Sequence, residues 1–369
     1  MSEDVAGGIL EAVYLDCQKK FIPVPADVPE RFLDNRKTGF NVNYFGFFLS
    51  VAMIIATVLS PLIIYAPSLK SIKIEALEGP SVMEIETYDT AGLIKGERDN
   101  TPYVLIPTAL GTTVFSNDLV TIDCSNTSQG YIIAHYYGES EKVKLRITGP
   151  DDVIYTYNLA TGGGKDEVFP LPAGDGKYMV CVYENLVGTQ YLTAFTQKVD
   201  VKISDQFLPF LYPNQYVDFN GNEQSIALAE YLAYTANTDL DVVSSVYNAI
   251  ISSITYDYDE AQTVESGYIP DIDEVLSTQK GICLDYAVLM TAMLRSQRIP
   301  TRMEVGYAGT AYHAWISTYI TDVGWVNGII EFDGKEWSLM DPTFASTTES
   351  EKLKNFIGDG ENYQTKYIY

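Results

Sequence analysis

The chain has 369 residues, of which 46% are hydrophobic and 20% charged, and its formal net charge is −25. This length and composition predict about two packed domains, and the negative charge excludes nucleic acid as a partner because it repels a phosphate backbone. His135 and His313 are the two histidines and the four cysteines form no CxxC pair, so the sequence predicts no metal site.

A long apolar run lies near the N-terminus. Residues 44–66 read YFGFFLSVAMIIATVLSPLIIYA, 23 residues without a charge. A helix of that length reaches about 34 Å, enough to cross a hydrocarbon core of about 30 Å. Basic residues are more frequent before the run than just after it, which predicts a cytoplasmic segment 1–43 and extracellular domains after the run. We therefore expect an uncleaved, single-pass anchor in the cell membrane.

A strand-rich region follows the predicted membrane helix. Residues 67–119 are of mixed composition and are interpreted as a stalk that could contribute strands to the next domain. Within residues 120–204, the stretch VKLRI at 143–147 alternates apolar and basic side chains, the period of a half-buried strand. Further β-rich runs separated by Gly- and Asp-containing turns predict a sandwich of immunoglobulin-like type.

Three residues of the predicted sandwich invite a chemical interpretation. His135, in the run YIIAHYYG, is interpreted as a strand-surface histidine, since the sequence suggests no acid–base partner for it. Cys124 and Cys181 could be joined outside the membrane, but a sequence cannot place their Cα atoms within bonding range. The disulfide is therefore left open.

The pattern becomes helical after residue 206, and one predicted helix carries a cysteine at its start. Residues 284–294 are apolar nearly all round, which predicts a buried helix. Cys283 precedes them, where the free backbone N–H groups and the helix dipole favour the nucleophilic thiolate. An isolated cysteine of this kind is more often an inert core residue, so it does not by itself indicate catalysis.

Two later segments supply the groups that a thiolate nucleophile needs. AYHAWISTYI carries His313 and WSLMDPTF carries Asp341, each at a predicted strand. An imidazole takes and returns the proton, and a carboxylate fixes its tautomer. Taken singly, His313 also fits a strand histidine and Asp341 a turn residue before Pro342. Together with Cys283 they predict a Cys-His-Asp triad.

The segments GICLDYA, RSQRIPTR, HAW and DPT together resemble the transglutaminase-like superfamily, in the bacterial branch related to animal transglutaminases and papain-type thiol proteases. The resemblance covers roughly residues 225–345. It implies that Cys283 is the nucleophile, His313 the general base and acid, and Asp341 the orienting carboxylate. It also implies an α+β, papain-like core for residues 205–369. The sequence contains no Walker loop and no Gly-x-Gly-x-x-Gly after a predicted strand, so no cofactor is expected.

The chain departs from that pattern in one place and leaves some roles open. Between His313 and Asp341 it inserts TDVGWVNGIIEFDGKEW, longer than a short hairpin, which could be a substrate-facing extension. The backbone N–H of Cys283 is one expected oxyanion donor. Candidates for the second donor are the side chains of Tyr256, Tyr258 and Gln279. Asp285 would most simply serve the helix N-terminus, although close to a thiolate it would oppose ionisation.

The sequence thus predicts a cell-surface thiol enzyme that acts on amide bonds of a protein or peptide substrate through a thioester. Hydrolysis and transamidation both remain open, and hydrolysis is slightly favoured because water is the default acceptor. The alternative is a non-catalytic adhesion or scaffold protein that uses the same fold for binding. A second alternative is that the sandwich is the working part and binds wall glycan or a protein, with the thiol domain auxiliary. It is less favoured because Trp315, Trp325 and Trp337 all lie in the C-terminal domain, so the sandwich has no tryptophan platform for sugar.

Overall fold

The computed structural model describes residues 88–265, 267–308, 311–321, 323–327, 329–332, 337–340 and 363–369. The predicted cytoplasmic segment 1–43 and the predicted span 44–66 lie outside these residues. Among the helices within them, none is long and apolar enough to cross a membrane.

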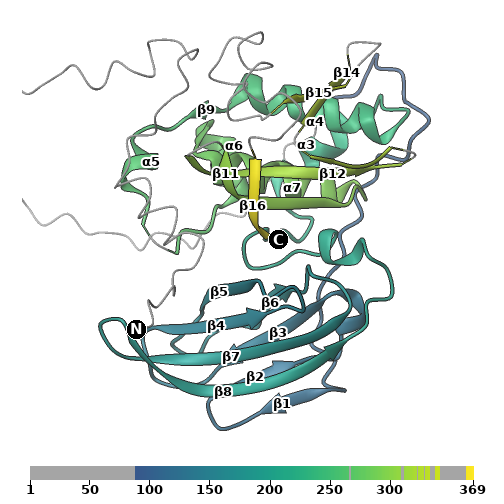
Figure 1. Cartoon of the computed structure of the whole chain (residues 1–369). Coiled ribbons are helices and arrows are strands. Elements are labelled where there is room, and N and C mark those ends of the chain that lie inside the picture. Colours follow the sequence, from purple (N-terminus) through teal and green to yellow (C-terminus); the bar gives the residue numbers. More distant parts are fainter. Residues whose placement is uncertain are drawn as a thin grey trace, which may run out of the picture. The chain divides into compact units, whose positions relative to one another are not determined.

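Residues 114–201 form two four-stranded antiparallel sheets (Figure 1). One sheet has the strand order β1-β2-β3-β6 and the other the order β5-β4-β7-β8. The strands are β1 (Val114–Ser116), β2 (Val120–Asp123), β3 (Tyr131–Tyr136), β4 (Val143–Thr148), β5 (Ile154–Leu159), β6 (Glu167–Pro170), β7 (Gly176–Val187) and β8 (Gln190–Val201). The alternation predicted at 143–147 is confirmed, since Val143, Leu145 and Ile147 are buried and the residues between them are half-buried.

The two sheets share one apolar core. The ring of Tyr157 on β5 meets that of Phe169 on β6 at a centroid distance of 4.8 Å, so the contact joins the sheets. Both cysteines in this region are free and buried, which answers the open question of the disulfide. The hydroxyl of Thr196 lies 3.6 Å from the Cys181 sulfur.

His135 lies on β3 as predicted, but it has a partner that the sequence did not suggest. Its Nδ1 is 2.9 Å from Oδ1 of Asp166, and its ring stacks on Tyr137 at 4.2 Å. Asp166 directly precedes β6, which pairs with β3. The pairing of β3 with β6 therefore brings Asp166 next to His135, although the two residues are 31 positions apart in the sequence.

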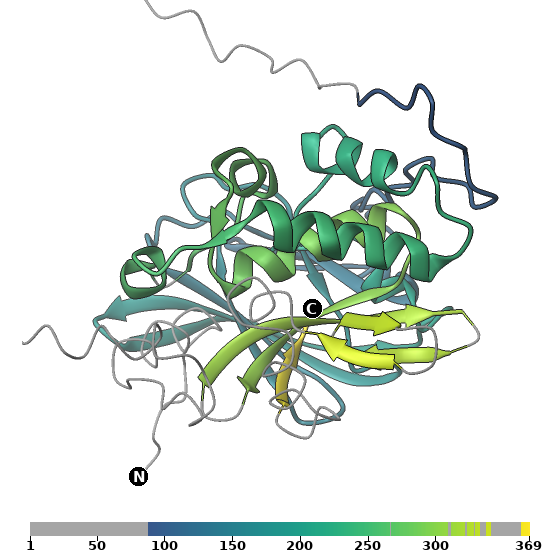
Figure 2. The ribbon, with the colours of Figure 1, turned by 90° about the horizontal axis from the view of Figure 1, so that it is seen from above.

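The C-terminal region combines helices with a four-stranded antiparallel sheet of order β13-β12-β11-β16. Figure 2 shows the helices gathered along one side of this sheet. The sheet contains β11 (Thr301–Ala308), β12 (Ala311–Ile320), β13 (Gly324–Asn327) and β16 (Tyr363–Ile368). Two smaller strand pairs are β9 (Thr255–Tyr256) with β10 (Lys280–Gly281), and β14 (Ile329–Phe332) with β15 (Trp337–Met340). The helices are α3 (Gln224–Leu232), α4 (Asp239–Ser253), α5 (Glu260–Thr263), α6 (Ile272–Thr278) and α7 (Cys283–Ser296), with single 3₁₀ turns at η4 (Thr127–Gln129) and η5 (Leu208–Phe210).

Helix α7 is the centre of this region. All 14 of its residues are buried, as its apolar sequence predicted. It packs against α3, α4, α6, β11 and β12. Each large apolar side chain that is fully buried in this way contributes about 1.5–3 kcal/mol to folding. The packing therefore holds the start of α7, and Cys283 with it, in a fixed place.

The far end of α7 carries a buried cation. Arg295 is 1% exposed and donates to three backbone carbonyls: that of Thr301 from Nε (3.0 Å) and Nη2 (2.8 Å), that of Tyr212 from Nη1 (2.7 Å), and that of Tyr369 from Nη2 (2.7 Å). These bonds satisfy the guanidinium, as a buried polar group requires. Burial lowers the pKa of Arg295 to about 9.

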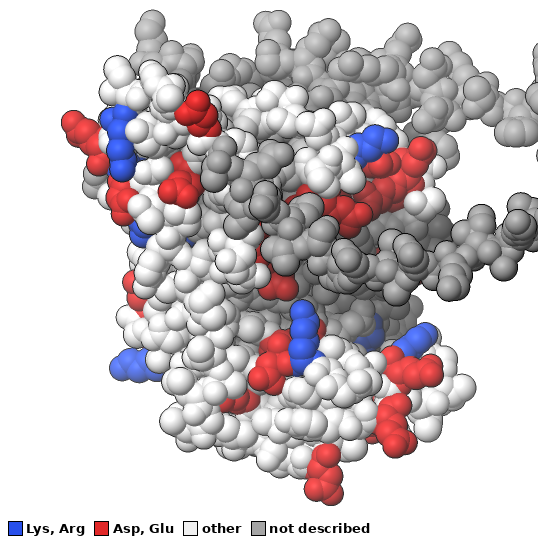
Figure 3. Space-filling model, turned by 180° about the vertical axis from the view of Figure 1, so that it is seen from behind, with Lys and Arg blue, Asp and Glu red and all other residues white. Residues whose placement is uncertain are grey.

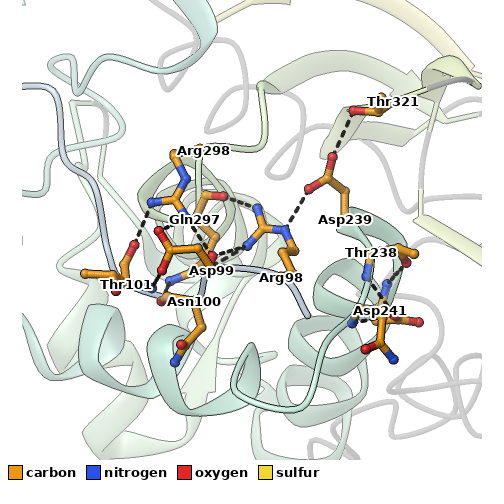
Figure 4. A network of polar contacts seen from close by, with 11 residues as sticks. Arg98, Asp99, Asn100, Thr101, Thr238, Asp239, Asp241, Gln297, Arg298 and Thr321 are labelled. Carbon is orange, nitrogen blue, oxygen red and sulfur yellow. Dashed lines mark hydrogen bonds and ion pairs between the residues drawn. The ribbon is translucent and has the colours of Figure 1, made fainter. Parts of the chain in front are cut away.

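A segment that precedes the sandwich is bound to the same end of α7 (Figure 4). Arg98 donates to Oδ1 of Asp239 at 2.8 Å and to the carbonyl of Gln297. Gln297 in turn donates to the carbonyl of Asn100 at 2.9 Å, and Arg298 donates to that of Thr101 at 2.8 Å. This part of the segment 67–119 is therefore tied to the C-terminal domain.

Gly306 is required where β16 approaches β11. A Cβ atom at this position would lie 2.0 Å from the carbonyl oxygen of Gln364 on β16. We expect Gly306→Ala to push β16 away and to lower the free energy of unfolding by at least about 2 kcal/mol in urea titrations.

Gly111→Ala is the control, because Gly111 has open space around it and a φ of +69°. It should cost only the penalty of placing an L residue in the left-handed backbone region, about 1 kcal/mol. Equal stability losses in the two variants would contradict the steric explanation.

Candidate active site

Cys283 begins α7 at the end of a short, well-fixed turn. The residue before it, Ile282, is extended and caps the helix. Ahead of that, β10 pairs in parallel with β9, and the Asp257 N–H donates to the carbonyl of Gly281 at 2.9 Å. Cys283 is 6% exposed. Its thiol thus lies at a helix N-terminus, where free N–H groups favour a negative charge.

His313 lies on β12, opposite Gly306 of β11, and is 5% exposed. Its ring stacks against that of Trp315, with centroids 6.2 Å apart. Because α7 packs against β12, the structure brings together the elements that carry Cys283 and His313.

Asp341 lies outside the described residues, directly after β15. β15 pairs with β14, and β14 contacts β12. The predicted insertion after His313 starts as sheet structure, because β13 (Gly324–Asn327) pairs with β12 and forms an edge of the sheet. This part of the insertion therefore widens the sheet that carries His313.

Asp285 is a fully buried carboxyl at the start of α7. Its Oδ2 accepts the N–H of Ile282 at 2.6 Å, so its predicted service to the helix N-terminus is confirmed. Its Oδ1 accepts the hydroxyl of Tyr268 at 2.7 Å. Burial raises the pKa of Asp285 to about 7, and the charge of Glu260 also acts to raise it. The hydrogen bonds from Tyr268 and Ile282 act in the opposite direction, because they favour the charged carboxylate.

Tyr268 and Glu260 were not found by sequence reasoning. Glu260 lies on α5 and Tyr268 lies in the connection that follows it. Both come before Cys283 in the chain, and no motif marks them. Burial and the neighbouring Asp257 raise the pKa of Glu260, whereas the Tyr268 hydroxyl acts to lower it. The face of the molecule drawn in Figure 3 carries more acidic than basic side chains.

The three candidates for the second oxyanion donor all lie near the β9–β10 pair. Tyr256 on β9 pairs with Gly281 on β10, and Gly281 is two residues before Cys283. Tyr258 contacts the Tyr256 ring edge-on at 5.0 Å and is 46% exposed. Gln279 ends α6 in a left-handed conformation with a φ of +55°.

Comparison with known proteins concerns the same region. Residues 226–328 match the model of a family described as the transglutaminase-like superfamily. This part of the chain, which includes Cys283 and His313, is therefore a transglutaminase-like domain. The UPF0252 protein MJ1282 of Methanocaldococcus jannaschii is 30% identical over 96 residues, which cover 23% of this chain and 27% of that protein. The chain thus spans about a quarter of the length of this curated relative.

Among solved structures, a proposed cysteine protease from Cytophaga hutchinsonii has a TM-score of 0.28 and 16% identity, covering 63% of this chain and 69% of the other. The red sea bream transglutaminase also has a TM-score of 0.28, with 11% identity and coverage of 64% and 55%.

The buried Asp285 predicts a pH-dependent stability. In the folded state Asp285 keeps its proton up to about pH 7, whereas its ordinary pKa, which we take for the unfolded chain, is 3.8. Because the folded state binds the proton more tightly, the free energy of unfolding falls as the pH rises from the lower to the higher of these values. Urea unfolding should show a loss of up to about 4 kcal/mol across that range in the wild type relative to Asp285→Asn. Parallel pH profiles for the two proteins would contradict the assignment.

Proposed function

We propose that the transglutaminase-like domain is a thiol enzyme that acts on amide or peptide bonds of a protein or peptide. Cys283 is the nucleophile, His313 the general base and acid, and Asp341 the carboxylate that orients His313. The proposal is supported by one observation above all. A segment matched by the family model carries Cys283 at the start of a buried helix and His313 on a strand packed against that helix.

The reaction follows from the chemistry of these groups. His313 takes the thiol proton, and the Cys283 sulfur attacks the carbonyl carbon of the substrate. The carbonyl oxygen becomes an oxyanion beside the N–H groups at the start of α7. The C–N bond then breaks, His313 gives its proton to the leaving amine, and an acyl thioester remains. Water or a second amine attacks the thioester and frees the sulfur. We favour water, which needs no acceptor site.

The same proposal places the enzyme at the cell surface. Residues 44–66 would anchor the chain in the membrane, with residues 1–43 in the cytoplasm and both folded regions outside. The sandwich would be of immunoglobulin-like type, which is supported by its strand orders β1-β2-β3-β6 and β5-β4-β7-β8 in two facing sheets.

Replacing the nucleophile should abolish turnover. We expect Cys283→Ala to lose at least about 10³-fold in activity, because the covalent step then has no nucleophile. The full chain is incubated with denatured protein and a tagged primary amine, and mass spectrometry detects new chain ends and tagged glutamines. Cys181→Ala, which removes a similarly buried thiol of the sandwich, should leave the products unchanged. Products from Cys283→Ala that match the wild type would contradict the proposal.

The two histidines offer an independent comparison. His313→Ala should lower the same activity by about 10²–10⁴-fold through loss of the proton carrier. His135→Ala removes the histidine that pairs with Asp166 on the sandwich, and activity should stay at the wild-type level. A loss of activity in His135→Ala equal to that in His313→Ala would show that neither loss reports catalysis.

A further inference from the structure

Glu304 is a buried carboxyl that bridges three strands of the sheet carrying His313. It lies on β11, the strand between β12 and β16, and is 5% exposed. Its Oε1 accepts the hydroxyl of Ser317 on β12 and its Oε2 accepts that of Thr365 on β16, each at 2.5 Å. Both oxygens are therefore bound, one to each neighbouring strand.

The register of the sheet places Glu304 on the same face as His313. Gly306 pairs with His313 and Glu304 pairs with Trp315, and the side chains of paired residues point to the same face. Alternate residues along a strand share a face, so all of these positions lie together. Because Gly306 has no side chain, Glu304 and Ala308 flank the imidazole on β11, and of these two only Glu304 can hydrogen-bond.

Trp315 connects this part of the sheet to the imidazole. Its ring stacks on that of His313 at an interplanar angle of 25°, with centroids 6.2 Å apart. Tyr363 of β16 contacts the same indole edge-on at a centroid distance of 5.0 Å, and Trp315 is 2% exposed. A displacement of β12 or β16 relative to β11 would therefore move the indole and the imidazole that stacks on it.

The pairing of β11 with β16 is irregular at this point. The register shifts between Val305 and Gly306, and a Cβ atom on Gly306 would lie 2.0 Å from the carbonyl oxygen of Gln364. A bulge disrupts the ladder locally, and a slip of one residue would turn each side chain of a strand to the other face. Glu304 precedes the shift and binds Thr365 beyond it, so this hydrogen bond fixes the register across the bulge.

We propose that Glu304 is a positioning residue for His313. By binding Ser317 of β12 and Thr365 of β16, it holds both strands in register beside the bulge, and thereby fixes the orientation of the imidazole against Trp315. The inference rests on the proposed function only in taking His313 as the proton carrier.

The two histidines of the chain allow a test that needs no substrate. With ¹³C in the histidine rings of the full chain, NMR gives one ring signal each for His135 and His313, and His135→Ala assigns them. Glu304→Leu keeps a side chain of similar size and removes both hydrogen bonds. We expect it to shift the His313 signal by more than the linewidth. In Glu304→Gln, whose amide can still bind both hydroxyls, the signal should lie closer to its wild-type position.

Glu167→Leu is the matched control. Glu167 is likewise a buried glutamate on a strand, 7% exposed, and its oxygens accept the N–H of Ala160 at 2.6 Å and the amide of Gln215 at 2.8 Å. Because it lies on β6 of the sandwich, its replacement should leave the His313 signal unmoved. An unmoved His313 signal in Glu304→Leu, or an equal shift in both variants, would overturn the proposal.

Turnover of a single denatured protein by the full chain is the second readout. We expect Glu304→Leu to lower kcat by about 10–100-fold and to leave KM within about twofold, because a misplaced proton carrier slows the chemistry and not the binding. Glu304→Gln should recover most of kcat. A kcat as low as that of Glu304→Leu would contradict the proposal, which assigns the effect to the hydrogen bonds.

Thr365→Val covers the case in which Glu304→Leu fails to fold. It removes one of the two hydrogen bonds from a strand that does not carry the histidine, so the His313 signal should shift in the same direction by a smaller amount. A folded Thr365→Val with an unmoved signal would overturn the proposal. If the His313 signal depends on Glu304 but the wild-type chain turns over no amide substrate, the proposed function is refuted and the positioning of His313 stands.

Discussion

A helix without an exposed face has to be enclosed, and this constraint organises the C-terminal region. Each residue of α7 is buried, so α3, α4 and α6 and the strands β11 and β12 are arranged around it. The enclosure determines where the two ends of α7 lie. Cys283 lies at one end and Arg295 close to the other, and the packing of the buried apolar side chains between them fixes the position of both.

The polar groups at the two ends are satisfied in different ways. At the far end, Arg295 binds carbonyls from three separate parts of the chain, and Gln297 joins the segment before the sandwich to the helix. These bonds secure α7. At the near end, Asp285 binds one backbone N–H and one hydroxyl, which leaves it close to its point of protonation near pH 7. The end that carries the thiol therefore responds to pH.

Local sequence patterns predicted the features that depend on neighbouring residues. The alternation at 143–147 and the apolar run of 284–294 both follow from the periods of strand and helix. The acidic partner of His135, the role of Tyr268 and the bonds of Arg98 to α4 and α7 could not be predicted in this way. Each depends on contacts between distant segments, which strand pairing and helix packing determine and which no short motif encodes.

The central claim is that Cys283 is a reactive thiol and not a core residue, and the described cysteines allow a direct test. Cys124, Cys181 and Cys283 are 3%, 9% and 6% exposed, so access alone predicts similar, slow labelling of all three. Burial raises the pKa of Cys124 to about 12. Limited alkylation of the native chain near neutral pH, followed by mass spectrometry of the three peptides, should label Cys283 far faster than the others. Equal labelling of the three cysteines would contradict the claim.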